Sequence, residues 1–167
     1  MSRVVIPVSQ EQVPEHLRTN RSAFTRWFGR TFYRAIGWNL EGSIADAERV
    51  MVVAAPHTSN WDFVFGISVI LGINARVRWL GKHSIFKFGV TWFFRWLGGI
   101  PVNRAQPDAV MGYVDEAVAK DNGVILVVAP EGTRKKAEKW KSGFLRIAKK
   151  NNCVIQLGAL DFANKRI

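Results

Sequence analysis

The pattern with the clearest chemical potential is a histidine followed five positions later by an aspartate, His57 and Asp62, in the segment HTSNWD. Histidine has an ordinary pKa of about 6.5, which suits proton transfer near neutral pH. An ionised Asp62 can hold the imidazole in one tautomer and stabilise the imidazolium that forms when the ring takes a proton. Side chains five positions apart lie on different faces of a helix. We therefore expect His57 in a loop and Asp62 in the first turn of the next helix, where the pair would act as a general base.

A structural interpretation of the same segment is also open. Ser59 and Asp62 have the spacing of a capping box, in which the two side chains satisfy N–H groups at the start of a helix. The chain has three histidines. In a chain with this many, the chance that at least one histidine is followed by an aspartate five positions later is roughly one in ten. The segment alone does not decide between a catalytic pair and a helix cap.

Two further loops carry charged side chains after predicted strands. Residues 98–104, GGIPVNR, end in Arg104, whose guanidinium can bind a phosphate through two parallel hydrogen bonds. Residues 130–134, PEGTR, present backbone N–H groups beside a carboxylate, a hydroxyl and a second guanidinium. Each loop also has an ordinary interpretation: a surface arginine after a turn in the first case, and a turn with a solvated salt bridge in the second.

Strands that alternate with helices would position these loops. The predicted strands are residues 49–55, 75–80, 100–102, 123–129 and 154–160. The predicted helices are residues 61–73, 85–97, 108–120, with Asp108 as N-cap, and 142–150. Two of the strands are continuous apolar runs, which is typical of strands buried on both faces. The pattern predicts a single α/β sandwich with a largely parallel central sheet flanked by helices, and with its working loops at the carboxyl ends of strands.

The chain divides into three segments. Residues 1–20 are expected to be irregular or loosely attached, since prolines interrupt any pattern there. Residues 21–40 read as an amphipathic helix with an aromatic arc and an arginine stripe. The arc comprises Phe24, Trp27, Phe28, Phe32, Ala35 and Trp38, and the stripe Arg26, Arg30 and Arg34. We expect this helix to pack on the core, to lie among lipid headgroups, or to do each in turn. Residues 41–167 form the α/β domain.

Composition narrows the range of partners. A chain of 167 residues fits one domain of about 100–200 residues. Apolar residues make up 48% and charged residues 22%, which excludes a disordered tail or a collagen-like repeat. The net charge is +11, with seven Trp and eleven Phe. Such a chain favours anionic partners with apolar parts: anionic membranes, phosphate-bearing lipids or nucleic acids.

Cysteine content and apolar run lengths bear on location. With Cys153 as the single cysteine, we expect no disulfide framework, no cysteine zinc site and a reducing, cytosolic compartment. The first residues lack the apolar core of a signal peptide. The longest uncharged apolar stretch, residues 63–75, is shorter than the roughly 20 residues of a spanning helix. The expected location is therefore cytoplasmic, either soluble or lying on a membrane.

Taken in order, HTSNWD, GGIPVNR and PEGTR resemble the signature blocks of the glycerolipid acyltransferases, the family that includes lysophosphatidic acid acyltransferase. The phrases APEGTRKK, residues 129–136, and WKSGF, residues 140–144, resemble a short bacterial branch of that family. The resemblance runs from about Arg49 to Phe162. It implies a glycerol-3-phosphate acyltransferase-like fold.

The resemblance also implies a reaction. A fatty acyl group would move from a thioester, acyl-CoA or acyl-acyl carrier protein, to the hydroxyl of a lysophospholipid or glycerol-phosphate acceptor in phospholipid biosynthesis. His57 would be the general base and Asp62 its partner. The acceptor's phosphate would be held by Arg104, Glu131, Gly132, Thr133 and Arg134, with Lys82 as a further cation. No metal or further cofactor and no nucleic-acid partner are implied. The protein would associate with the inner face of the membrane, and helices 61–73 and 85–97 would either line an acyl-chain groove or form plain core.

Two departures from the family pattern leave an alternative open. A fourth apolar block ends in proline in the family, where this sequence has Leu157. The relatives also run on beyond the position of Ile167, so we expect a domain that lacks their usual C-terminal end. A basic run follows PEGTR, with Lys135, Lys136, Lys139, Lys141, Arg146, Lys149 and Lys150. The alternative is therefore an inactive relative or a non-enzymatic basic module that binds anionic membranes or nucleic acid.

Overall fold

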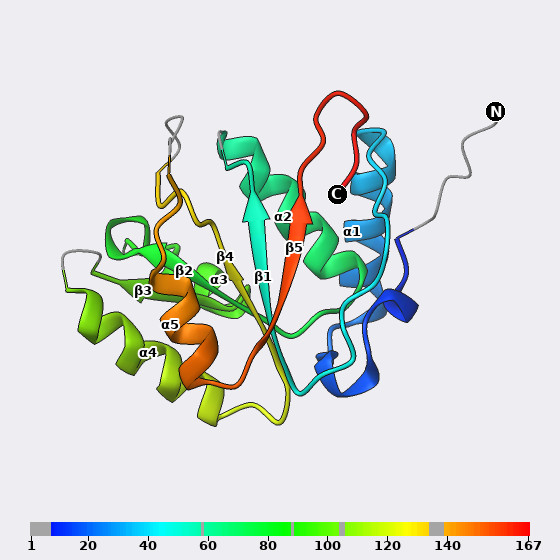
Figure 1. Ribbon diagram of the computed structural model, residues 1–167. Coiled ribbons are helices and arrows are strands. Elements are labelled where there is room, and N and C mark those ends of the chain that lie inside the picture. Colours follow the sequence, from blue (N-terminus) through cyan, green and yellow to red (C-terminus); the bar gives the residue numbers. More distant parts are fainter. Residues whose placement is uncertain (1–7, 58, 88, 104–105, 134–138) are drawn as a thin grey trace.

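The fold is a parallel sheet between two layers of helices (Figure 1). The computed structural model describes residues 8–57, 59–87, 89–103, 106–133 and 139–167. The strands are β1 (Arg49–Ala55), β2 (Val77–Lys82), β3 (Gly99–Val102), β4 (Val124–Val128) and β5 (Val154–Ala159). Their order is β3-β2-β4-β1-β5, and every pairing is parallel. The predicted α/β sandwich is confirmed.

Strand register brings the predicted working loops to one edge of the sheet. Val53 of β1 pairs with Val128 of β4 on one side and with Leu157 of β5 on the other. Lys82, the last residue of β2, pairs with Val102, the last residue of β3. Because all strands run the same way, the segments after β1, β2, β3 and β4 all leave the sheet at its carboxyl edge.

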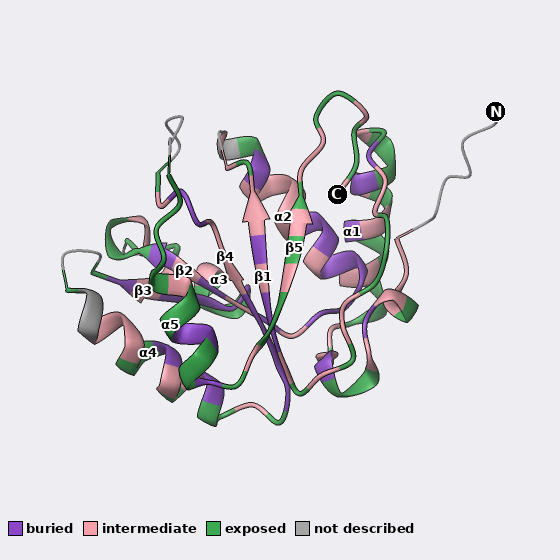
Figure 2. Ribbon diagram, in the orientation of Figure 1, coloured by how far each residue is buried: buried purple, intermediate pink, exposed green. Residues whose placement is uncertain are grey.

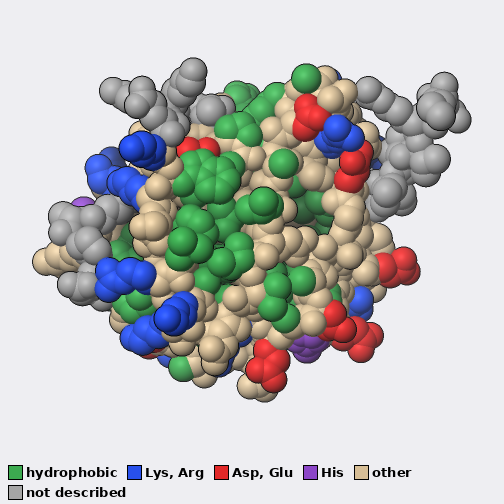
Figure 3. All heavy atoms as spheres, viewed as in Figure 1, with side chains coloured by type: hydrophobic (Ala, Val, Ile, Leu, Met, Phe, Trp, Pro, Cys, Tyr) green, Lys and Arg blue, Asp and Glu red, His purple; other side chains and the backbone are tan. Residues whose placement is uncertain are grey.

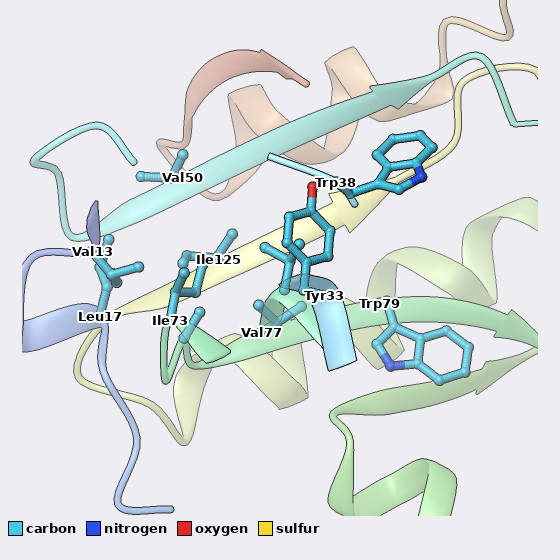
Figure 4. Packing of buried hydrophobic residues seen from close by; sticks show 11 residues of the cluster. Val13, Leu17, Tyr33, Trp38, Val50, Ile73, Val77, Trp79 and Ile125 are labelled. Atoms are coloured by element: carbon cyan, nitrogen blue, oxygen red, sulfur yellow. The ribbon is translucent and has the colours of Figure 1, made fainter. Parts of the chain in front are cut away.

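Helices cover the two faces of the sheet. They are α1 (Ala23–Ala35), α2 (Asn60–Gly72), α3 (Thr91–Trp96), α4 (Pro107–Ala119) and α5 (Gly143–Lys150), with 3-10 helices η1 (Gln10–Gln12), η2 (Glu15–Leu17) and η3 (His83–Ile85). One core cluster joins the sheet to α1 and α2, and Figure 4 shows Tyr33, Ile73 and Ile125 within it. The other joins the sheet to α4 and α5 through residues such as Met51, Val114 and Ile147. Figure 2 shows buried residues in β1, between these layers, whereas β5 is drawn as intermediate and exposed.

Several predicted boundaries differ from the observed ones, such as the strand predicted at residues 75–80, which is Val77–Lys82. Two of the differences have clear local reasons. The helix expected over residues 85–97 is only the 3-10 turn η3 followed by the short α3. Gly89 lies between them at φ +91, a left-handed conformation through which an α-helix cannot continue. Gln106, rather than the predicted Asp108, is the N-cap residue of α4. Pro107 begins the helix because its fixed φ suits the first helical position.

Residues 8–20, in the segment expected to be irregular or loosely attached, contain the short 3-10 helices η1 and η2 and are attached to the core. Val13 and Leu17 are fully buried in the core. Backbone hydrogen bonds join this segment to the turn between α2 and β2: Arg76 N donates to Leu17 O at 2.7 Å, and Thr19 N donates to Asn74 O at 2.9 Å. Residues 1–7 lie outside the described part of the chain.

Helix α1 ends at Ala35, short of the predicted residue 40, and packs on α2 through a glycine. Trp38 of the predicted arc lies beyond the helix and packs against Phe65 of α2, with ring centroids 4.5 Å apart. A Cβ at Gly29 would lie 2.7 Å from both Gly72 N and Ser68 O, so the two helices approach closely there. Tyr33 is buried beside this contact. The aromatic side chains Phe24, Trp27 and Phe28 are instead exposed. Among the described residues, no helix has the length and apolar character needed to cross a bilayer.

Strand β5 forms one edge of the sheet and is only partly covered. Ile155 and Leu157 pair with Met51 and Val53, so they lie on the α5 side of the sheet. Both are nevertheless exposed, and Leu157 is 69% exposed. Figure 3 shows apolar side chains gathered in the middle of this face, with Lys and Arg side chains to one side.

Candidate active site

His57 and Asp62 meet at the carboxyl end of β1. His57 lies in the loop between β1 and α2, and Asp62 lies in the first turn of α2. His57 Nδ1 is 3.2 Å from Asp62 Oδ2. The Asp62 side chain is 3% exposed and the His57 side chain 27% exposed. A buried carboxylate thus faces one nitrogen of a ring that solvent or a substrate can reach.

The same carboxylate also caps the helix. Asp62 Oδ2 accepts a hydrogen bond from Ser59 N at 2.7 Å, and Ser59 Oγ accepts one from Trp61 N at 3.1 Å. This is the capping box that the spacing predicted. The structural and catalytic interpretations of the segment are therefore compatible, because one oxygen serves both contacts. A carboxylate that accepts from Nδ1 favours a proton on that nitrogen and leaves the Nε2 lone pair available.

A second carboxylate reaches His57 from the neighbouring strand. Glu131 lies in the loop after β4 and is 8% exposed. Its Oε1 accepts a hydrogen bond from the backbone N–H of His57 at 3.1 Å. Its Oε2 is buried and has no hydrogen-bond partner within the described ranges. Two acidic side chains from different loops thus hold His57, one at the ring and one at the backbone.

The turn that carries Glu131 is braced on both sides. Gly132 N donates to Ala129 O at 3.1 Å, and Lys141 N donates to Pro130 O at 2.9 Å. Gly132 has φ +63, a conformation that residues with a Cβ adopt only at a cost. A Cβ at this position would also lie 3.0 Å from Lys141 Cδ.

The structure describes only some of the residues that are expected to bind phosphate. Lys82 is exposed at the end of β2, on the same edge of the sheet as His57. Thr133 is exposed in the loop after β4. Arg104 and Arg134 lie outside the described residues. The two loops that carry them begin at the edge where His57 and Asp62 lie.

The inward faces of the two apolar helical segments form core. Phe63 of α2 packs against Trp79 at a centroid distance of 4.9 Å and against Phe94 of α3 at 5.9 Å. Trp79 also stacks on Phe86 at 5.8 Å. An acyl-chain groove along these helices would therefore have to use their outer surfaces, where Trp61 and Trp92 are exposed.

Sequence reasoning missed the contact between Glu131 and His57. It grouped Glu131 with the phosphate ligands, although the structure shows its carboxylate buried against a backbone N–H. The contact depends on β1 and β4 being neighbours, and the order of strands along the chain does not reveal that pairing. The sequence signal that could have suggested this contact is the pair of buried apolar strands, each followed by a polar loop.

The chain is similar to known proteins over most of its length. A family model described as Acyltransferase matches residues 11–156. Among solved structures, the chain is similar to the 1-acyl-sn-glycerophosphate (LPA) acyltransferase PlsC from Thermotoga maritima, with 29% sequence identity and a TM-score of 0.54. The match covers 79% of this chain and 54% of that one, so the chain spans about half the length of the solved structure. No curated protein gives a significant match.

The shared oxygen of Asp62 generates a testable prediction. In Asp62→Ala, the neutral His57 ring should lose its preference for a proton on Nδ1, because the acceptor is gone. Nitrogen-15 NMR of the ring measures this shift. The matched control is Ser59→Ala, which removes the other half of the capping box and should lower stability by about 1 kcal/mol without changing the tautomer. Identical ring spectra for Asp62→Ala and the parent chain would show that Asp62 only caps the helix.

Proposed function

The chain belongs to the acyltransferase family, and from that premise we propose that it transfers a fatty acyl group from a thioester to the hydroxyl of a lysophospholipid or glycerol-phosphate acceptor. The observation that carries the proposal is the 3.2 Å contact between His57 Nδ1 and Asp62 Oδ2 at the carboxyl edge of the sheet. A positioned imidazole with a buried carboxylate partner is suited to activate an alcohol. The donor would be acyl-CoA or acyl-acyl carrier protein, and the pathway phospholipid biosynthesis.

The proposed reaction is a direct transfer. Nε2 of His57 takes the proton of the acceptor hydroxyl as its oxygen attacks the thioester carbonyl. The C–O bond forms, the C–S bond breaks, and the proton leaves the imidazolium for the departing thiolate or for solvent. Asp62 stabilises the imidazolium while it exists. Proton transfer of this kind contributes about 10²–10⁴ in rate. Thiolates are good leaving groups, so no covalent enzyme intermediate is required.

Oxyanion stabilisation would come from the start of α2. The helix begins at Asn60, directly after the His57 loop. Its N-terminus carries a partial positive charge, although the capping box already satisfies the N–H group of Trp61. Developing negative charge on the carbonyl oxygen is favoured at such a position.

Binding of the acceptor would depend on cations around the same edge. Arg104 and Arg134, assisted by Lys82, would bind the phosphate, and the exposed Thr133 would add to the site. A guanidinium binds phosphate in a fixed, bidentate geometry. The binding energy would then orient the hydroxyl toward His57.

Removal of the base gives the most direct test. His57→Ala should lower acyl transfer by about 10²–10⁴-fold and leave the fold intact. Release of free thiol from an acyl thioester, with and without acceptor, measures the reaction, and mass detection of the acylated lipid identifies the product. His16→Ala is the matched control, because His16 lies far from this edge and contacts Ala47 O. Normal turnover in His57→Ala would refute the proposed base.

Removal of a phosphate ligand tests how the acceptor is held. Arg104→Ala should raise KM for a phosphorylated acceptor at least about tenfold, since a charge-assisted bidentate contact is lost. KM for an unphosphorylated alcohol should not change. Lys120→Ala is the control, because Lys120 is exposed and directly follows α4. An equal loss with both acceptors would remove Arg104 from the phosphate site.

We further propose that an anionic membrane surface is a partner, with the protein bound peripherally to the inner face of the cytoplasmic membrane. Exposed aromatic side chains on α1 and α3 support this: Phe24, Trp27, Phe28, Trp92, Phe93 and Trp96. Trp27 is 58% exposed and Trp92 70% exposed. Large exposed aromatic patches are unusual on soluble monomers, and tryptophan favours the membrane interface.

Positive charge accompanies these aromatic residues. The Arg21 guanidinium lies 5.9 Å from the centroid of the Trp96 ring, which makes the start of α1 a neighbour of α3. Burial lowers the pKa of Arg21 to about 10, so the side chain stays charged at pH 7. Arg34 and Arg95 are exposed on the same two helices. A net charge of +11 adds long-range attraction to an anionic surface.

Membrane binding is testable with the double variant Trp27→Ala/Trp92→Ala. Binding to vesicles of phosphatidylcholine with phosphatidylglycerol should weaken at least about tenfold, because two aromatic side chains can no longer insert. Tyr113→Ala, on α4 in the other layer, is the control. Equal binding by parent and variant would contradict the proposed surface. Tight, salt-sensitive binding to RNA, with no thiol release, would favour the non-enzymatic basic module.

A further inference from the structure

Glu131 has a position that a phosphate ligand would not occupy. Glu131 is 8% exposed, and its Oε1 accepts a hydrogen bond from His57 N at 3.1 Å. The two residues are 74 positions apart and come from the loops after β4 and β1, which are adjacent strands. An ionised carboxylate repels a phosphate group, and burial withdraws it from an incoming acceptor. The likeness to acyltransferase motifs therefore does not by itself make Glu131 an acceptor ligand.

We propose that Glu131 is a positioning residue, which fixes the backbone of His57 and does not contact the acceptor. Asp62 holds the imidazole at Nδ1, 3.2 Å from Oδ2, whereas Glu131 holds the main chain of the same residue. The two carboxylates come from different elements, so together they define both the place of the Cα atom and the direction of the ring. The inference rests on the proposed function, because positioning matters only if His57 reacts.

The local structure around Glu131 is suited to this role. Gly132 adopts φ +63 directly after it, and Gly132 N closes the turn onto Ala129 O. Lys141 N braces the turn from outside through Pro130 O. The turn is therefore held at two points, which fixes the direction in which the Glu131 side chain leaves the backbone. Small displacements matter here, since a shift of about 1 Å at a reacting group can cost about 10²-fold in rate.

The decisive comparison is between two substitutions at this position. Glu131→Gln keeps an oxygen that can accept the His57 N–H bond, so kcat should fall by less than about fivefold. Glu131→Ala removes the acceptor, so kcat should fall by about 10–100-fold. KM for a lysophosphatidic acid acceptor should change by less than about twofold in either variant, because the acceptor is not touched. Glu116→Ala, on the exposed surface of α4, is the control.

Hydrogen exchange at the His57 amide gives a readout that does not depend on turnover. This amide should be protected in the parent chain and in Glu131→Gln, and should exchange much faster in Glu131→Ala, whereas the amides of β1 stay protected. Such a local change separates loss of the bond from general destabilisation. If the parent chain transfers no acyl group, the proposed function fails, and the exchange rates still report whether Glu131 holds His57.

Three results would overturn the inference. The first is a raised acceptor KM with normal kcat in Glu131→Ala, which would make Glu131 a substrate ligand. The second is equal loss of kcat in Glu131→Gln and Glu131→Ala, which would make the negative charge the important property. The third is unchanged protection of the His57 amide in Glu131→Ala.

Discussion

Oδ2 of Asp62 is shared between the backbone N–H of Ser59 and Nδ1 of His57, and this sharing joins the start of α2 to the imidazole. Burial makes the arrangement demanding. A carboxylate removed from water needs polar contacts to compensate for lost hydration, and these two groups supply them at Oδ2. The helix start and the ring direction are thus determined by the same atom. Any change that moves the first turn of α2 also moves the ring.

The parallel sheet is what brings the second carboxylate into place. Adjacent parallel strands end at the same edge, so the loops after β1 and β4 begin side by side. Glu131 crosses that short gap to reach His57 N. A buried site built on strand ends in this way brings together residues 74 positions apart in the chain. The register of the sheet determines how accurately the two loops are placed relative to each other.

Local patterns predicted the elements well and the long-range contacts poorly. The apolar run at residues 49–55 predicted β1 with its observed bounds, because a strand buried on both faces has a continuous apolar sequence. The break at Gly89 was missed, since an isolated glycine in an apolar segment does not reveal its φ. The burial of Val13 and Leu17 was missed because it depends on contacts with distant strands. The His57–Asp62 pair is local and was found, whereas the Glu131 contact depends on strand order and was not.

The uncovered side chains of β5 have a consequence for how the protein behaves in solution. An edge strand offers unpaired backbone groups, and Leu157 and Ile155 add apolar side chains beside them. Such an edge is a template on which another chain can add a strand. Mutual repulsion from a charge of +11 opposes this association at low ionic strength. Salt shortens the range of that repulsion to a few ångströms at about 1 M, so concentrated salt weakens this opposition to edge-to-edge association.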